Sequence, residues 1–231
     1  NPNQKKKIKK NFIIYKTNTT WQKARIEGLK KLLKKNPKNI IFADSDDILH
    51  KDRIKFSLNK IQKYDFIVNN CYLFQKTIKK KEIWLKRKEK KIELNQIKYS
   101  NFVGCSNTTI RGNAMKKIID KINVNLIAFD WCIAKLLLIK KFKGIYISKP
   151  LTFYRQYGEN TSSLINISKK KIKKDIKCKL AHFRYFEKFG INYKKQILEL
   201  KNKYRIIGNK KFLSDIKKNF KTKNQYWWSL V

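Results

Sequence analysis

An alternation of apolar, strand-like runs with a helical segment constrains the fold of this chain most strongly. Residues 11–15 form a short apolar run, residues 21–35 repeat apolar side chains at helical spacing until an Asn-Pro pair, and residues 40–43 form a second apolar run. A strand, a helix of about four turns and another strand make a βαβ unit. Such a unit predicts an α/β fold with a parallel sheet and with function at the carboxyl ends of its strands.

The second apolar run stops at a cluster of acids, Asp44-Ser45-Asp46-Asp47. Three carboxylates in four positions are unusual here, because the chain has 58 Lys and Arg but 16 Asp and Glu, a formal net charge of +42. Carboxylate oxygens are the ligands that Mg²⁺ and Mn²⁺ prefer, and a cation held by one or two of them keeps positions for substrate phosphates. The cluster therefore predicts a divalent-cation site, with a strand-to-helix turn capped by acids as the alternative.

The remaining pattern continues the alternation and then becomes helical from residue 168 onward. The chain is therefore expected to divide into an α/β domain, residues 1–165, and a basic, aromatic-containing helical region, residues 166–231. The other predicted elements are helices at 52–63, 113–122 and 129–140, strands at 64–69, 71–74, 144–147 and 151–155, a charged hairpin or loop at 76–91, and a turn running into a short strand at 102–110.

Length and composition allow one domain with a real core, since 42% of the 231 residues are apolar. No apolar stretch approaches the ~20 residues that a spanning helix needs. The four cysteines are far apart and, with two histidines, give no zinc-ligand spacing, so we expect reduced thiols in a cytoplasmic protein. The positive charge has two interpretations, a genome rich in AT codons or attraction to nucleotide phosphates, anionic lipid or nucleic acid.

Four segments follow one another in a recognisable order. They are Ala24-Arg25 with Gly28, the apolar strand ending in Asp44-Ser45-Asp46-Asp47, Asp130-Trp131, and Tyr154-Arg155-Gln156-Tyr157-Gly158-Glu159-Asn160. Together they resemble the A-R-N-x-G, D-x-D-D, acidic-Asp-Trp and R-x-H-x-x-N motifs of family 2 glycosyltransferases. The resemblance spans residues 12–162. It implies a GT-A-like (Rossmann-like) fold with a mixed, mostly parallel sheet flanked by helices, here followed by a C-terminal helical extension.

The resemblance also implies a role for each candidate residue. Asp46 is expected to bind Mn²⁺ or Mg²⁺ directly, Asp44 to support the metal or the ribose, and Asp130 to act as the base that takes the acceptor's proton. Asp47 is either a further ligand or a helix N-cap, and Asp130 has a first-turn acid as its alternative. The expected donor-binding residues are Asp44, Ser45, Asp47, Arg25, Arg155 and Tyr157, and the expected acceptor-binding residues are Gly104, Ser106 and Trp131.

Three departures from the family pattern stand out. Phe129 occupies the position where a second acid usually precedes the base, and Tyr157 stands where a histidine often reaches the metal. Nothing before residue 11 resembles the strands that hold the nucleotide base. We therefore expect a chain that begins at the third strand of this fold, with the base-binding half missing by truncation, supplied by another chain, or lost together with activity.

The resulting prediction is a metal-dependent inverting glycosyltransferase that uses a nucleotide-diphosphate sugar and a glycan or lipid-linked acceptor in surface polysaccharide or lipopolysaccharide synthesis. A non-catalytic remnant and a basic nucleic-acid-binding module are the alternatives, although the scattered lysines indicate no specific nucleic acid. A haloacid-dehalogenase-like phosphatase also places D-x-D after a strand, but its later G-D-x-x-x-D segment is not in the sequence.

The C-terminal region mixes lysines with aromatic residues. Two arrangements suit this mixture, a peripheral helix that lies on an anionic membrane surface at the cytoplasmic face, or packing onto the catalytic domain. The aromatic residues concerned are Phe183, Tyr185, Phe186, Phe189, Tyr226, Trp227 and Trp228.

Overall fold

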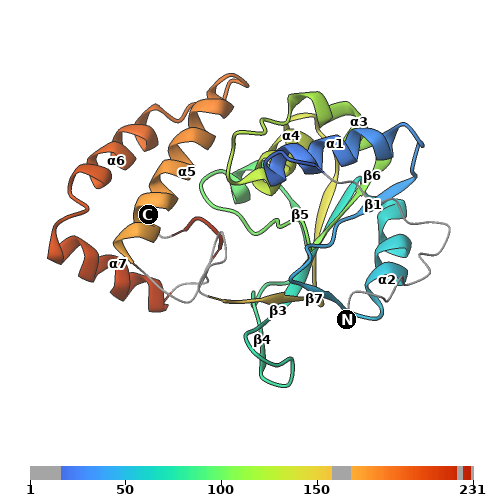
Figure 1. Ribbon diagram of the computed structural model, residues 1–231, viewed down its shortest axis with the longest axis horizontal. Coiled ribbons are helices and arrows are strands. Elements are labelled where there is room, and N and C mark those ends of the chain that lie inside the picture. The colour runs from blue at the N-terminus through green and yellow to red at the C-terminus, as the bar shows by residue number, and fades with distance from the viewer. Residues whose placement is uncertain (1–16, 158–167, 223–225, 230–231) are drawn as a thin grey trace.

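The computed structural model describes residues 17–157, 168–222 and 226–229 (Figure 1). In these ranges a mixed sheet is flanked by helices, so the α/β prediction is confirmed. The strands are β1 (Asn39–Ile41), β2 (Ile48–Leu49), β3 (Phe66–Phe74), β4 (Lys81–Ile83), β5 (Lys90–Ile92), β6 (Thr108–Arg111) and β7 (Gly144–Arg155). The α-helices are α1 (Trp21–Leu33), α2 (Arg53–Lys60), α3 (Gly112–Ile118), α4 (Phe129–Ile139), α5 (Lys169–Glu187), α6 (Lys194–Arg205) and α7 (Lys210–Thr222).

The central sheet has the strand order β1-β6-β3-β7-β2, with β4 added to β3 and β5 added to β7. The pairing of β3 with β7 is parallel, whereas the other pairings among the described strands are antiparallel. The expected predominance of parallel pairing is therefore not found in this part of the chain, because β6 inserts antiparallel between β1 and β3. The predicted strand at residues 11–15 lies outside the described residues.

Most predicted elements are present at their expected positions. The predicted helices at 21–35, 52–63 and 129–140 are α1, α2 with the short 3₁₀ turn that follows it, and α4. The two predicted strands at 144–147 and 151–155 are instead one continuous strand, β7. It runs through Pro150 because the register shifts beside Asn70, and such an irregularity tolerates a residue that cannot donate to the ladder.

Side chains alternate across the sheet and so build two cores. Phe66, Val68 and Tyr146 belong to the large core beneath α1, α3 and α4. Ile67 and Ile145 point the other way and join the small core under α2. Successive residues of a strand must alternate in this way, and burial on both faces explains why β3 and β7 begin with apolar runs, residues 66–68 and 144–147.

The C-terminal helices pack onto α4. The indole of Trp131 stacks on His182 of α5 at 3.9 Å, and Lys135 Nζ donates to the Tyr193 hydroxyl at 2.8 Å. Phe183 and Phe186, like Trp227 and Trp228, are buried. The membrane-facing arrangement is therefore wrong for these four aromatic side chains, and packing onto the α/β domain is correct, because the rings cover apolar surface of α4 and of the sheet.

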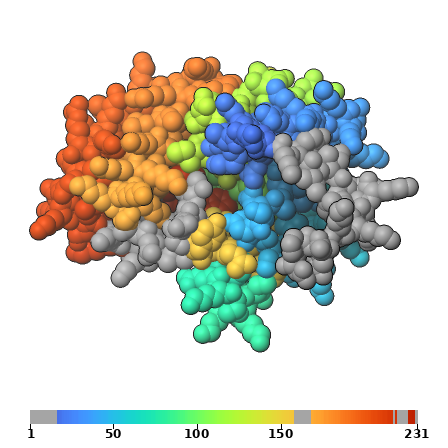
Figure 2. All heavy atoms as spheres, in the orientation of Figure 1, coloured from blue at the N-terminus to red at the C-terminus, as the bar shows by residue number. Residues whose placement is uncertain are grey.

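None of the described helices has the length and apolar character needed to cross a membrane. The hairpin of β3 and β4 projects from the sheet, as the lower part of Figure 2 shows.

Two glycines make a matched stability test. An added Cβ at Gly144 would lie 2.1 Å from the buried Phe66 ring, whereas one at Gly28 in α1 meets no atom within 4 Å. We expect Gly144→Ala to lower the free energy of unfolding by about 1–3 kcal/mol through overpacking. Gly28→Ala should raise it by roughly 0.5–1 kcal/mol, because Ala is the better helix former. Urea denaturation measures both, and a stable Gly144→Ala variant would contradict the close packing of β3 on β7.

Candidate active site

A cavity of about 500 Å³ lies where β1 ends. It collects most of the residues singled out by the sequence, from five separate parts of the chain. The lining residues include Arg25 of α1, the acidic loop Asp44-Ser45-Asp46-Asp47, Gly104, Ser106 and Asn107 of the loop before β6, Asp130 of α4, Tyr154, Tyr157, Trp21, Trp227 and Trp228.

A larger hollow of about 750 Å³ lies between α1, α2 and α3. None of the described residues that line it is an Asp, Glu, His or Cys, and its arginine, Arg111, donates to the backbone carbonyls of Ile61, Gln62 and Tyr64. The smaller cavity is therefore the better candidate for chemistry.

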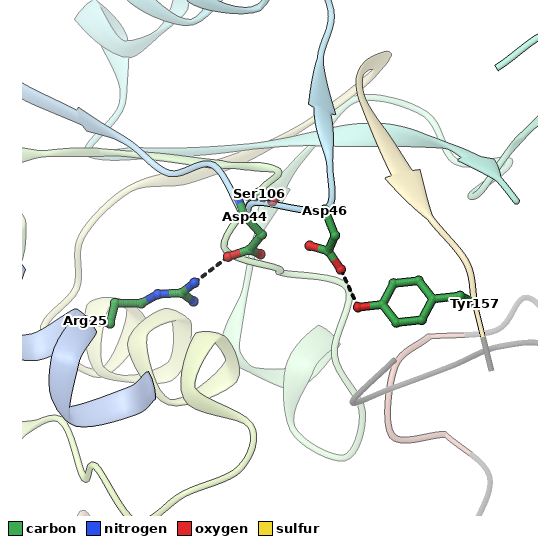
Figure 3. Close-up of polar contacts among 5 residues, drawn as sticks. All are labelled: Arg25, Asp44, Asp46, Ser106 and Tyr157. Atoms are coloured by element: carbon green, nitrogen blue, oxygen red, sulfur yellow. Dashed lines mark hydrogen bonds and ion pairs between the residues drawn. The ribbon is translucent and has the colours of Figure 1, made fainter. Parts of the chain in front are cut away.

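Asp44 is held from two sides. Its backbone N–H donates to Ser106 Oγ at 2.8 Å, and its carboxylate forms an ion pair with the guanidinium of Arg25 (Figure 3). Arg25 reaches the loop from the middle of α1, which begins with a Thr20 cap on the backbone of Lys23. The helix therefore fixes a cation beside the first acid of the cluster.

Asp46 points to the other side of the loop. Its Oδ2 accepts a hydrogen bond from the Tyr157 hydroxyl at 2.8 Å (Figure 3). Its backbone carbonyl accepts from Arg155 Nε at 3.1 Å. The tyrosine that stands in place of the family's histidine thus contacts the residue predicted to bind the metal.

Arg155 lies beside the acidic loop. Its guanidinium lies 4.6 Å from the Phe74 ring and bonds to a backbone carbonyl of the acidic loop, and the residue does not line the cavity. The expected contact with a donor diphosphate stays a prediction, since the observed hydrogen bonds of the Arg155 guanidinium are to the protein's own backbone. Arg155 positions the loop, because its backbone N–H also donates to Asp47 Oδ1 at 3.0 Å.

Asp47 is half-buried and unusual in its charge state. Burial raises its pKa to about 7, and Asp46 and Asp44 add to the effect, while hydrogen bonds from Ser106 and the Arg155 backbone oppose it. Asp47 is not the expected helix cap, since β2 follows it and α2 begins after Asp52. Its other expected role, as a further metal ligand, stays a prediction.

Asp130, the predicted base, lies at the start of α4. Its Oδ1 accepts from the Trp131 N–H at 2.7 Å and from Asn101 Nδ2 at 3.3 Å. Burial raises its pKa to about 7, against the opposing effect of the Trp131 hydrogen bond, and Asp44 raises it further while Arg25 lowers it. The two interpretations of Asp130 thus coexist, because it bonds to the first turn of a helix and also lines the cavity with a pKa suited to proton transfer.

Whether the cavity can hold a divalent cation depends on which of these carboxylates are able to coordinate it. Within residues 17–157, 168–222 and 226–229, no group of three or more His, Cys, Asp or Glu side chains could hold a metal ion by itself. Asp44 is paired with Arg25, and burial raises the pKa of Asp47. Asp46, whose contact is a neutral hydroxyl, fits a cation shared with the phosphates of a ligand, the usual arrangement for Mg²⁺.

The three predicted acceptor residues separate into two groups. Gly104 and Ser106 line the cavity, whereas Trp131 is completely buried and donates its indole N–H to the Ile97 carbonyl at 2.6 Å. The expectation that Trp131 contacts an acceptor is therefore wrong. Its ring faces α5 and serves the core.

The chain's C-terminal segment supplies residues that sequence analysis missed. Trp227 packs on Trp84 at 4.1 Å, and its backbone carbonyl accepts from the Asn101 N–H at 2.9 Å. An added Cβ at Gly104 would lie 2.6 Å from the Trp227 ring. Glycine at this position therefore makes room for the indole, and it was the single local signal of that contact. Trp228, with φ of 61°, completes this wall.

No protein-family model and no curated protein matches the chain. Among solved structures it is similar to S. aureus TarS 1-349 in complex with UDP-GlcNAc, with 15% identity and a TM-score of 0.41 over 78% of this chain and 60% of that one. It is also similar to the same protein in complex with UDP, with 17% identity and a TM-score of 0.40 over 71% and 51%. The chain thus spans less than two thirds of these structures.

Asp130→Asn tests the raised pKa. An unfolded Asp titrates near pH 4, so between about pH 4 and 7 the unfolded carboxyl ionises while the folded one stays protonated, and stability falls as pH rises. Asn does not titrate. The free energy of unfolding of Asp130→Asn minus that of wild type should therefore rise by about 1–3 kcal/mol across this range and stay level above it. This is less than the ~4 kcal/mol that the full difference between the folded and unfolded pKa values would give, because solvent screens part of the effect.

Urea denaturation at about pH 4.5, 6 and 7.5 measures this difference. Asp120→Asn is the control, since Asp120 is exposed on the surface and pairs with Lys30. A difference between Asp130→Asn and wild type that does not change with pH would contradict the assignment.

Proposed function

We propose that this protein is a metal-dependent, inverting glycosyltransferase of the GT-A type. It transfers a sugar from a nucleotide-diphosphate donor to a glycan or lipid-linked acceptor of a surface polysaccharide or lipopolysaccharide. The observation that carries the proposal is the meeting, in one cavity, of a carboxyl that titrates near neutrality with an acidic loop that fits a phosphate-bound cation.

The proposed reaction is a single displacement. The acceptor hydroxyl attacks the anomeric carbon, a new carbon–oxygen bond forms, and the bond from that carbon to the diphosphate oxygen breaks with its electron pair on the diphosphate. Asp130 takes the hydroxyl proton on Oδ2, since its Oδ1 is occupied by Trp131 and Asn101. Attack opposite to the leaving group inverts the anomeric configuration.

Other residues hold and orient the donor. Asp46 would hold Mn²⁺ or Mg²⁺ together with the diphosphate, and the cation would supply stabilisation of the negative charge on the leaving group. Arg25 adds a fixed positive charge to the same cavity. Arg155 and Ser106 keep the acidic loop in shape through its backbone, so little reorganisation is needed when the donor binds.

Removal of the base should abolish turnover but not donor binding. With UDP-sugars or GDP-sugars, Mn²⁺ and wild-type protein, nucleotide release should increase with pH to a plateau above about pH 7, because Asp130 must lose its proton. Asp130→Asn should lower the rate roughly 10²–10⁴-fold. Asp120→Asn, on the surface away from the cavity, serves as the control.

Unchanged turnover in both Asp46→Ala and Asp130→Asn would refute the proposal. Donor binding by wild type without any turnover would instead identify the non-catalytic alternative.

Metal binding should depend on the nucleotide. Because the Asp44 carboxylate is paired with Arg25, the acidic loop offers few free ligands, so Mn²⁺ should bind weakly to the protein and about tenfold or more tightly when UDP or GDP supplies phosphate oxygens. Electron paramagnetic resonance of free Mn²⁺ measures both affinities, and Asp46→Asn should remove the gain. Equally tight binding without nucleotide would show a metal site of another kind.

A further inference from the structure

Trp21 is a large aromatic side chain at the rim of the cavity, and no role has yet been given to it. It is the first residue of α1 and is 47% exposed, although it lines the same cavity as Arg25 and Asp44. Two neighbours hold the indole in place. The Arg25 guanidinium carbon lies over the ring at 5.4 Å, and the Phe129 ring meets it edge-on at 6.1 Å. A fixed but exposed indole at the mouth of a cavity is typical of a ligand contact.

The polar residues of the cavity form a series that ends at this indole. Tyr157 donates a hydrogen bond to Asp46 at one end of the series. Asp44, two residues before Asp46 in the same loop, pairs with Arg25 (Figure 3). Trp21 lies one helical turn before Arg25 in α1, and the Cβ atoms of residues at this spacing are about 5–6 Å apart. A diphosphate bound at Asp46 therefore has Asp44 beside it and then, past Arg25, the aromatic surface of Trp21.

We propose that Trp21 stacks on the nucleobase of the donor. The proposal rests on the function proposed above and deepens it by setting the direction of the nucleotide, with the diphosphate at Asp46 and the base on the indole. Every nucleobase has a π-face, so an aromatic platform needs no base-specific hydrogen bonds. The Arg25 cation lies over the indole, and 47% of Trp21 is still exposed, which leaves area for a planar ring.

A sugar ring of the acceptor is the competing occupant of this surface. The acceptor has to approach Asp130, and the wall linked to that residue is formed by the C-terminal segment, since Asn101 bonds both to Asp130 and to the Trp227 backbone. Trp21 contacts Phe129, the residue before Asp130, but the cation over its ring is Arg25, which pairs with Asp44 of the acidic loop. The base is joined to the diphosphate that this loop is proposed to hold, so we place the base at Trp21 and the acceptor on the side of Trp227.

Calorimetric titrations of the full chain with UDP, GDP and pyrophosphate, each with Mn²⁺, test the proposal. Trp21→Leu should weaken UDP and GDP roughly 5- to 150-fold, the range measured for loss of one base–aromatic stack, and should leave pyrophosphate within about twofold. Trp21→Phe, which keeps an aromatic face, should recover most of the loss. Tyr99→Leu is the control, since Tyr99 is an exposed aromatic residue outside the cavity.

Each of three other results of these titrations would overturn the proposal. An equal loss for pyrophosphate and UDP would mean that Trp21 acts only by positioning Arg25. Unchanged UDP and GDP affinity in Trp21→Leu, with binding abolished in Asp46→Asn, would remove the base platform and leave the proposed function standing. Failure of wild type to bind any of the three probes would refute both.

Discussion

The parallel pairing of β3 with β7 is the contact on which the rest of the structure depends. It joins two segments about 80 residues apart, from Phe66 opposite Gly144 to Phe74 opposite Arg155. Both faces of the pair are buried, one under α1, α3 and α4 and the other under α2. The end of the same ladder delivers Arg155 to the acidic loop, so the main core and the geometry of the site are set by one contact.

The acidic loop keeps its shape through backbone hydrogen bonds rather than through its charges. Asp44 N–H is bound by Ser106, Asp47 N–H by the Asp44 carbonyl, and Asp47 Oδ1 by the Arg155 backbone. The carboxylates are therefore held close together although burial and mutual repulsion both act against their ionised forms. The raised pKa of Asp47 is the cost of that arrangement, and a cation bound at Asp46 would relieve part of it.

Sequence analysis was most successful where a pattern is local. The helices α1 and α4 follow from apolar periodicity, and the meeting of Asp44, Asp46 and Asp130 follows from their places at the ends of strands and the start of a helix. The antiparallel insertion of β6 was missed because pairing direction depends on where a chain returns, which periodicity does not record. Trp131 was misplaced because a motif gives residue order and not the side to which a side chain points.

The C-terminal segment shows why the helical region cannot be regarded as an appendage. Trp227 reaches the cavity only because α5, α6 and α7 carry the chain back to the sheet domain, where Asn101 bonds to the Trp227 backbone and to Asp130. The indole covers Gly104 in the wall of the cavity that Asp130 also lines. Since burial is the largest cause of the raised pKa of Asp130, the protonation behaviour of the site depends on helices that contribute no charged group to it.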